Sequence, residues 1–403
     1  MPTRHTVRSW LALLIALPTV CVAVWIVVPA PNQFLLPLGV GAPEVSAWFI
    51  VTGVLAMAVA MVDVRRRWLS RIALAMAVIA VALSAIPFVR FRAVATAADH
   101  AMRMALGGEP LDQLAAAHRA TWRPAPLVFG DLFRAPRTLA APIRVSRGIR
   151  FAIVERDTLT LDVYRPSASG HFPVLVQIYG GAWQRGDPGN NGEFAEYIAA
   201  QGYVVFAIDY RHAPQFQFPA QVDDVRSALS WIGRNADAWN ADTSRMVLLG
   251  RSAGAHLALM AAYTPGAPRI RGVIDYYGPV DLVEGYRQIP TPDPLDVRAT
   301  EEAFLGGPPD AMIDRYRAAS PIALVTRRLP PTLLIYGGRD HVVEPRFGAM
   351  LAGRLRAEGT TVVHIEIPWA EHAFDAVPYG PSGQLARYIT ERFLAWATTK
   401  PER

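Results

Sequence analysis

The distribution of apolar residues divides the chain into two regions. Three apolar stretches with almost no charge inside them occupy Trp10–Val28, Val45–Val62 and Ile72–Val89. Each is close to the roughly 20 residues that a helix needs to cross the core of a bilayer. A cleavable signal peptide is the alternative for the first stretch, but its apolar run is too long and others follow. A buried helical hairpin is the alternative for the other two. Three stretches in succession favour membrane spans.

The second region begins near Ile149, where short apolar runs alternate with amphipathic stretches. The runs predict strands at Arg150–Glu155, Thr160–Tyr164, Val174–Tyr179, Val204–Asp209, Met246–Gly250, Val273–Tyr277, Thr332–Tyr336 and Val362–Ile367. Helices are predicted at Ala220–Arg234, Ala253–Ala262 and Arg346–Glu358. Apolar strands separated by helices indicate an α/β fold with a mostly parallel sheet covered on both faces. The first two strands are expected to form an antiparallel edge. Functional residues should lie on loops at the carboxyl ends of the strands.

These patterns divide the chain into three parts. Residues 1–90 form a three-span membrane region, and residues 147–403 form the α/β domain. Residues 91–146 begin as an Ala-rich, helix-like stretch and then become rich in proline. We therefore expect a juxtamembrane helix and a linker there, which together are a candidate cap for the functional site.

Composition and charge exclude some partners. Hydrophobic residues make up 52% of the chain, and the excess lies in the first ninety residues. The net charge of +6 comes almost wholly from scattered arginines, whereas nucleic-acid-binding proteins gather their charge on one face or in runs. No nucleic acid partner is therefore expected. The single cysteine, Cys21, excludes a disulfide within the chain and a thiolate metal site.

The arginines also predict an orientation, because basic residues favour the cytoplasmic side of a membrane. The one tight cluster, Arg65-Arg66-Arg67, joins the second and third apolar stretches, whereas Pro31–Glu44 contains no Lys or Arg. The N-terminus and the cluster should therefore lie inside, and everything after Val89 outside. Arg90 and Arg92 oppose the rule, which large translocated domains tolerate. We expect an integral protein of a bacterial cell membrane with its α/β domain on the extracytoplasmic side.

A candidate nucleophile lies at a predicted junction between a strand and a helix. Gly250-Arg251-Ser252-Ala253-Gly254 matches G-x-S-x-G, and it follows the apolar run Met246–Leu249 and precedes a small-residue helix pattern. Such a turn holds the serine in a strained conformation, exposes its hydroxyl and directs the next N–H, that of Ala253, toward a developing oxyanion. The alternative is an ordinary Gly–Ser turn, which the flanking strand and helix disfavour.

A serine hydroxyl needs a base, and the base needs a group that holds it in the correct tautomer. Of the nine histidines, His372 directly follows the last predicted strand, whereas His256 lies on the nucleophile's own helix and is expected to pack. Asp340 follows the preceding strand. The chain order Ser252, Asp340, His372 is the one expected when such a nucleophile lies on this type of sheet.

Backbone donors for an oxyanion are expected after the strand Val174–Tyr179. The segment Tyr179-Gly180-Gly181-Ala182-Trp183 carries paired glycines, which let N–H groups turn toward a reacting carbonyl oxygen. A plain Gly-Gly turn is the alternative.

The motifs together resemble the hormone-sensitive-lipase-like and carboxylesterase branch of the α/β-hydrolases, from about Ile149 to the C-terminus. They are Leu161-Asp162-Val163-Tyr164-Arg165-Pro166, Gly180-Gly181-Ala182-Trp183, Asp209-Tyr210-Arg211-His212-Ala213-Pro214, Phe218–Val225, the elbow at Ser252, Gly338-Arg339-Asp340 and Glu371-His372-Ala373-Phe374. The resemblance implies oxyanion donors at Gly181, Ala182 and Ala253. Tyr179 replaces the family's usual histidine, and Ala182 stands at its fourth loop position. Members with tryptophan in this loop include feruloyl-esterase-like, arylformamidase-like and prenylcysteine-methylesterase-like enzymes, of which the last also carry N-terminal spans.

The sequence therefore predicts a membrane-anchored serine carboxylesterase that needs no metal or organic cofactor and acts on a small-molecule or lipid-like ester. The insert Gly278–Pro321 is a further candidate cap. The same residues also fit an amidase or arylformamidase, and a non-catalytic binding module on this fold would be expected to have a broken triad. A transport role is disfavoured because the spans contain no central ionisable residue. Oligomeric state, acyl chain length and leaving group stay open.

Overall fold

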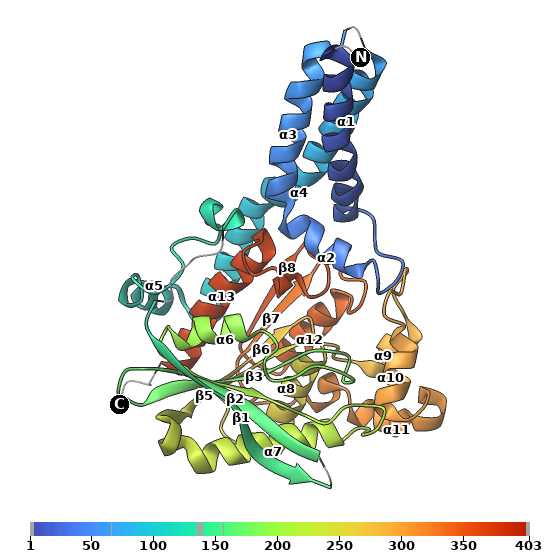
Figure 1. Ribbon diagram of the computed structural model, residues 1–403. Helices are drawn as coiled ribbons and strands as arrows, with labels where there is room; N and C mark the ends of the chain where they lie inside the picture. The colour runs from blue at the N-terminus through green and yellow to red at the C-terminus, as the bar shows by residue number, and fades with distance from the viewer. Residues whose placement is uncertain (1–3, 66, 135–139, 156, 400–403) are drawn as a thin grey trace.

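A bundle of long helices stands on an α/β domain in the computed structural model, which describes residues 4–65, 67–134, 140–155 and 157–399 (Figure 1). Arg66 of the arginine cluster lies outside the described residues. The bundle consists of α1 (Arg4–Ala23), α3 (Ser46–Asp63) and α4 (Trp68–Leu106). A short 3-10 helix, Val24–Ile26, continues α1. By length and composition alone, all three helices could cross a membrane.

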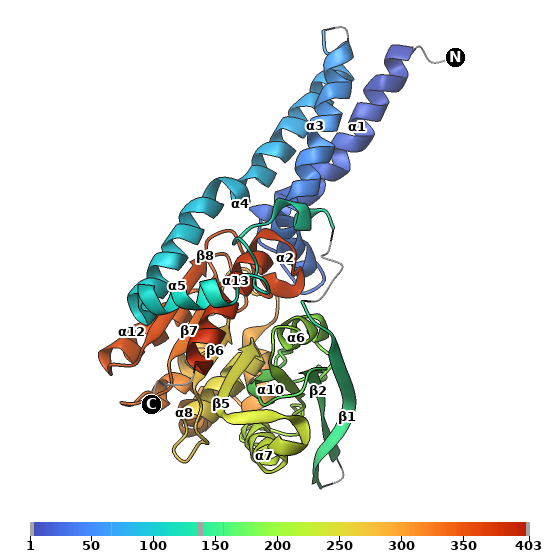
Figure 2. The same ribbon diagram turned by 90° about the vertical axis from the view of Figure 1, so that its left-hand side faces the viewer.

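The third helix is longer than the sequence predicts. Helix α4 has 39 residues and continues past Val89 to Leu106, so the third apolar stretch and the juxtamembrane helix form one continuous element. At 1.5 Å per residue, it is about 58 Å long. Its second half leaves the bundle and runs along the α/β domain (Figure 2).

The helices of the bundle pack through small side chains. Six alanines are fully buried between them: Ala12, Ala16, Ala56, Ala60, Ala73 and Ala77. Large apolar side chains point outward instead, for example Leu14, which is 69% exposed, and Ile79. Small residues at helix contacts and large apolar residues outside are typical of helices that associate within lipid. Polar contacts lie at the end of the bundle far from the α/β domain, where His5 Nδ1 is 2.5 Å from Asp63 Oδ1.

A short helix connects the first two long helices. It lies in the segment Pro31–Glu44, for which the sequence predicts no helix. Helix α2 (Leu36–Glu44) lies at the foot of the bundle, between the bundle and the α/β domain (Figures 1 and 2). After α4, the chain forms α5 (Gly108–Ala117) and a 3-10 turn at Phe129–Leu132. Helix α5 packs against α4 and the C-terminal helix.

All eight predicted strands are present in one sheet. They are β1 (Ile143–Val154), β2 (Asp157–Pro166), β3 (Phe172–Ile178), β4 (Val204–Ile208), β5 (Ala241–Arg251), β6 (Gly272–Tyr276), β7 (Thr332–Gly337) and β8 (Val362–Ile367). Their order is β1-β2-β4-β3-β5-β6-β7-β8. Strands β1 and β2 are antiparallel to their neighbours, as predicted for the edge, and β4, β3 and β5–β8 run parallel.

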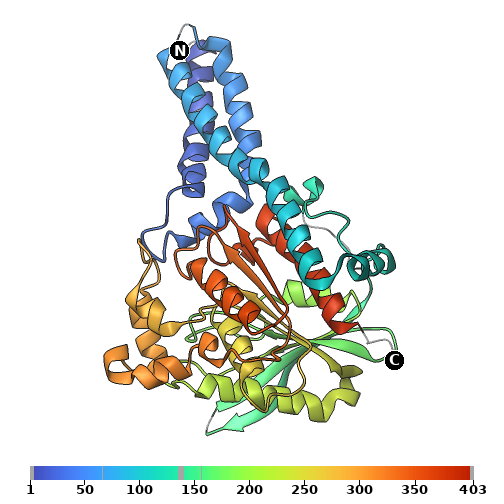
Figure 3. The ribbon, with the colours of Figure 1, turned by 180° about the vertical axis from the view of Figure 1, so that it is seen from behind.

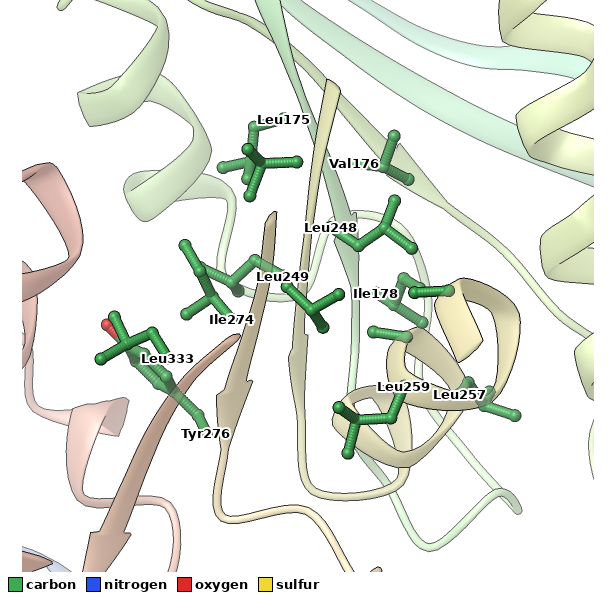
Figure 4. Packing of buried hydrophobic residues seen from close by; sticks show 14 of the residues in the cluster. Leu175, Val176, Ile178, Leu248, Leu249, Leu257, Leu259, Ile274, Tyr276 and Leu333 are labelled. Carbon is green, nitrogen blue, oxygen red and sulfur yellow. The ribbon is translucent and has the colours of Figure 1, made fainter. Parts of the chain in front are cut away.

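Helices cover both faces of the sheet. One face carries α6 (Gly192–Ala199) and α13 (Pro381–Thr398), and the other carries α7 (Ala220–Asn235), α8 (Ala253–Tyr263) and α12 (Arg346–Ala357) (Figures 1 and 3). The predicted helices at 220, 253 and 346 are confirmed. Leu257 and Leu259 of α8 lie beside Ile178 and Leu248 of the central strands (Figure 4). This packing fixes the start of α8 against the ends of β3 and β5. The insert between β6 and β7 forms α9 (Leu282–Arg287), α10 (Val297–Leu305) and α11 (Pro309–Ala318).

The close packing of the bundle is open to test by enlarging one of its buried alanines. Ala56→Leu should lower the free energy of unfolding of the detergent-solubilised protein by about 1–3 kcal/mol, because added methyl groups force the packed helices apart. Val54→Leu, on the same helix but 52% exposed, is the matched control and should leave the thermal midpoint unchanged. Equal midpoints for the two variants in a melting experiment would contradict this packing.

Candidate active site

Ser252 lies in the turn between β5 and α8, with a backbone conformation (φ 52°, ψ −123°) that few side-chain-bearing residues adopt. Its N–H donates to the carbonyl oxygen of Tyr276 at 2.9 Å. A Cβ atom on Gly250 would lie 2.1 Å from the carbonyl oxygen of Gly254, and one on Gly254 would lie 2.3 Å from that of Ile178. No side chain fits at either glycine, so the G-x-S-x-G spacing is a packing requirement of this turn.

Ser252, His372 and Asp340 form one chain of hydrogen bonds. Ser252 Oγ is 3.0 Å from His372 Nε2, and His372 Nδ1 is 2.8 Å from Asp340 Oδ2. The other carboxylate oxygen of Asp340 accepts the N–H groups of Val342 at 2.8 Å and Val343 at 2.7 Å. Asp340 follows β7 and His372 follows β8, so the parallel strands bring both loops to the edge of the sheet that carries Ser252.

The charge of Asp340 affects the protonation of His372. Burial alone would lower the pKa of His372, but the adjoining Asp340 carboxylate raises it, and the net pKa lies above the usual value for histidine. The Nδ1–H bond to Asp340 leaves Nε2 as the free acceptor toward the serine hydroxyl when the ring is neutral. The geometry therefore suits proton transfer from Ser252 to His372.

Glu371, which the sequence analysis does not single out as a functional residue, holds the two catalytic loops together. Its Oε1 accepts the N–H of His341 at 2.7 Å and that of His372 at 2.9 Å, and its Oε2 is 2.6 Å from His341 Nδ1. The hydrogen bond that the His341 ring donates to the Glu371 carboxylate raises the pKa of His341 above its usual value. Glu371 is thus a positioning residue that ties the loop carrying Asp340 to the loop carrying His372.

The loop after β3 offers backbone donors beside Ser252. Gly181 has φ 135°, and Ala182 and Trp183 adopt left-handed φ values of 56° and 59°. A Cβ atom on Gly181 would lie 2.0 Å from the carbonyl oxygen of Arg185. Among the described residues, the N–H groups of Gly181, Ala182 and Ala253 have no hydrogen-bond acceptor. Strained backbone with free donors is what an oxyanion site requires.

Tyr179, which stands where the family usually has histidine, holds the start of this loop in place through hydrogen bonds. Its hydroxyl donates to Asp209 Oδ1 at 2.6 Å and lies 2.9 Å from His212 Nε2. Its carbonyl oxygen accepts the hydroxyl of Tyr210 at 3.1 Å. The Asp209-Tyr210-Arg211-His212 motif therefore supports the loop, and the tyrosine fills the structural position left by the histidine.

His256 packs, as the sequence predicts, and it connects three parts of the site. Trp183 Nε1 donates to His256 Nδ1 at 3.2 Å, and His256 Nε2 donates to the carbonyl oxygen of Ala319 at 2.7 Å. Burial lowers the pKa of His256 to about 4, so the ring is neutral at pH 7. Trp183 also stacks on Phe304 of the insert, with ring centroids 4.2 Å apart. The loop after β3, helix α8 and the insert thus form one packed unit.

Two cavities meet at Ser252 and share Ala182, Leu295 and Val342 as lining residues. One extends under the insert and is lined further by Pro279, Gly285, Gln288, Pro290, Val297, Thr300 and Glu301. The other extends past His372 to Leu36 of α2. The insert thus encloses one side of the site. None of the described residues in 91–146 lines either cavity.

Glu301 is an unusual lining residue because its carboxyl group is buried in an apolar cavity. It is only 3% exposed, and its Oε2 has no hydrogen-bond partner among the described residues. Burial, and secondarily the nearby Asp281, raise its pKa well above the usual value. Within the described part of the chain, no group of three or more His, Cys, Asp or Glu side chains is arranged to hold a metal ion.

Comparisons with known proteins agree with the fold. The BD-FAE family matches residues 161–355. The chain is 30% identical over 251 residues to the probable carboxylic ester hydrolase LipM of Mycobacterium tuberculosis, covering 58% of this chain and 57% of that protein. It is 33% identical over 232 residues to the esterase LipC of the same organism, covering 54% and 57%. The chain thus spans somewhat more than half the length of these curated relatives.

A solved structure shows the same fold. The esterase of the archaeon Pyrobaculum calidifontis superimposes with a TM-score of 0.56 at 24% identity, over 64% of this chain and 87% of that one. The predicted resemblance is confirmed, because the α/β domain has the α/β-hydrolase fold and its sequence is similar to those of carboxylesterases.

The buried carboxyl group of Glu301 predicts a pH-dependent loss of stability. In the unfolded chain the group ionises near pH 4, whereas in the folded protein it holds its proton to much higher pH. The folded state therefore binds more protons, and its stability falls as the pH rises between these two pKa values. Glu301→Gln has no group that titrates at this position. The difference in unfolding free energy between the variant and the wild type should therefore shift in favour of the variant as the pH rises from 4 to 8, as measured in denaturant titrations. A difference that does not change with pH would contradict this account.

Proposed function

We propose that the chain is a membrane-anchored serine carboxylesterase that works through an acyl-enzyme intermediate. The observation that carries the proposal is the continuous hydrogen-bonded chain Ser252–His372–Asp340 beside the free N–H groups of Gly181, Ala182 and Ala253. The names of the relatives support an ester as the bond that is hydrolysed.

The geometry suggests the following steps. His372 Nε2 takes the hydroxyl proton of Ser252 as Ser252 Oγ attacks the ester carbonyl carbon. The tetrahedral oxyanion accepts hydrogen bonds from the free N–H groups, and Asp340 stays ionised to stabilise the imidazolium. His372 then protonates the leaving alcohol oxygen. A water molecule, deprotonated by His372, then attacks the acyl carbon. The bond between this carbon and Ser252 Oγ breaks, His372 returns the proton to Oγ, and the carboxylic acid is released.

Three observations support the membrane anchor. The three long helices are apolar, their small residues face inward, and their large apolar residues face outward. The start of α1 and the end of α3 lie together at one end of the bundle, and the α/β domain lies at the other (Figure 1). With the arginine-rich end inside, the positive-inside rule gives an extracytoplasmic catalytic domain.

A fluorophosphonate probe tests the activated serine. Membranes containing the wild type should label covalently, because the probe phosphonylates only a serine hydroxyl whose proton a base removes. Ser252→Ala should not label, whereas Ser227→Ala, which changes an exposed serine, should label like the wild type. Failure of the folded wild type to label would eliminate the proposed mechanism. Turnover of a phenyl ester and of an arylformamide by the labelled preparation would then distinguish esterase from formamidase.

The His372–Asp340 pair predicts a specific pH profile. Catalysis needs neutral His372, so kcat/KM should rise with pH through an inflection above histidine's usual pKa of about 6.5. Asp340→Asn removes the charge that raises this pKa, so the inflection should move to lower pH. It should also reduce kcat on the order of 10³–10⁴-fold, because the ring loses its orienting partner. The exposed Asp310→Asn is the control, and an unmoved inflection in Asp340→Asn would exclude this role for Asp340.

A further inference from the structure

The cavity at Ser252 is partly walled by the segment that joins the first two bundle helices. Leu36, the first residue of α2, lines the same cavity as Ser252 and His372. The stretch from Val27 to Pro43 carries no charged residue. A soluble hydrolase completes its active site without a wall from a membrane hairpin. The contact of Leu36 with this cavity therefore points to a role in how the substrate enters.

Three contacts fix this segment to the α/β domain, two of them at the loops that carry Asp340 and His372. Arg339, next to Asp340, donates from Nη2 to the carbonyl oxygen of Val27 at 2.5 Å. Gly39 packs against Glu371, next to His372: a Cβ atom on Gly39 would lie 3.8 Å from Glu371 Cγ.

The third contact is at the start of α13. Glu44 is buried, and its Oε2 accepts the N–H of Ser382 at 2.9 Å. A Cβ atom on Gly380 would lie 2.3 Å from the same oxygen, so Gly380 provides the space for the carboxylate. With the two contacts above, this bond holds the hairpin at a set position relative to both catalytic loops.

Exposed apolar side chains surround this junction. Phe34, two residues before Leu36, is 83% exposed, and Val28 at the end of the first span is exposed as well. Phe129 and Phe133 of the linker are exposed too, and Phe133 contacts Trp48 of α3 with ring centroids 5.1 Å apart. Tryptophan concentrates at the boundary between lipid and water, and Trp48 is 47% exposed. The junction therefore lies at the membrane surface when the bundle spans the bilayer.

We infer that the cavity receives its substrate from the bilayer, past α2, and that the substrate is a carboxylic ester of a membrane-resident amphiphile whose aliphatic chain contacts Leu36. The inference rests on the proposed function, since it names the substrate class and entry path for the same Ser252 site. A water-soluble ester that enters from the aqueous side is the competing source, and the experiment separates the two.

The test uses the full chain reconstituted in phosphatidylcholine vesicles. Dioleoylglycerol, a two-chain ester that exchanges slowly between vesicles, is placed either in the same vesicles as the protein or in separate ones. Fluorophosphonate titration counts active sites, and p-nitrophenyl acetate reports turnover of a soluble ester. The inference predicts release of oleate at least tenfold faster when enzyme and lipid share a bilayer.

A pair of variants tests the entry path. Leu36→Ala removes an apolar wall, so the ratio of kcat/KM for dioleoylglycerol to that for the acetate should fall about tenfold, the loss typical of removing one buried leucine contact. Leu38→Ala, on the same helix but not in the cavity wall, should keep the wild-type ratio. Wild-type levels of fluorophosphonate labelling show that each variant is folded.

The outcomes separate the two proposals. Acetate turnover with no oleate release, equal oleate release from shared and separate vesicles, or an unchanged ratio in Leu36→Ala would overturn the bilayer route and leave the esterase proposal standing. A wild type that neither labels nor turns over acetate would overturn the esterase proposal itself.

Discussion

The site depends on backbone packing that leaves no room for side chains at three glycines. At Gly250 and Gly254, the backbones of β5, α8 and the end of β3 approach so closely that a Cβ atom would collide with a carbonyl oxygen. Gly180 lies against the carbonyl oxygen of Arg251, from which a Cβ atom would be 2.6 Å away, and this contact brings the loop after β3 next to Ser252. This packing forces Ser252 into its strained conformation and sets the loop donors beside its hydroxyl. Residues held in such conformations persist only where the surrounding structure enforces them, and here the central parallel strands do so.

Two other parts of the protein pack against this centre, namely the insert between β6 and β7 and the foot of the helical bundle. On one side, the insert is locked to the oxyanion loop through Trp183, His256 and Phe304, so the wall of the inner cavity and the oxyanion donors are positioned together. On the other side, Val27 and Gly39 at the foot of the helical bundle contact the loops that carry Asp340 and His372. The segment that connects the first two helices also forms part of the wall of the cavity at Ser252.

Local patterns in the sequence were sufficient for the sheet and for proposing the site residues. The eight apolar runs became eight strands, and the central strands, which are buried on both faces, gave the clearest signal. Ser252, Asp340 and His372 could be proposed because each lies shortly after the end of a strand. Other features depend on contacts between distant residues. The sequence of α2 is rich in Pro and Gly, which is typical of a loop. The segment is nevertheless helical, and it packs against α13 and Glu371. The end of the third apolar run at Val89 marks a change in polarity, whereas α4 continues because the following alanine-rich residues also favour a helix. The sequence around Glu371 does not indicate its three hydrogen bonds, because two of them are with His341, which is 30 residues away.

The central claim is that Ser252 carries the acyl group during turnover. Peptide mass spectrometry of the enzyme quenched with acid during hydrolysis of p-nitrophenyl acetate tests this most directly. The account predicts an acetyl group on the peptide containing Ser252, which forms during turnover and disappears when the substrate is exhausted. Turnover without an adduct on Ser252, or with the acetyl group on another residue, would contradict it.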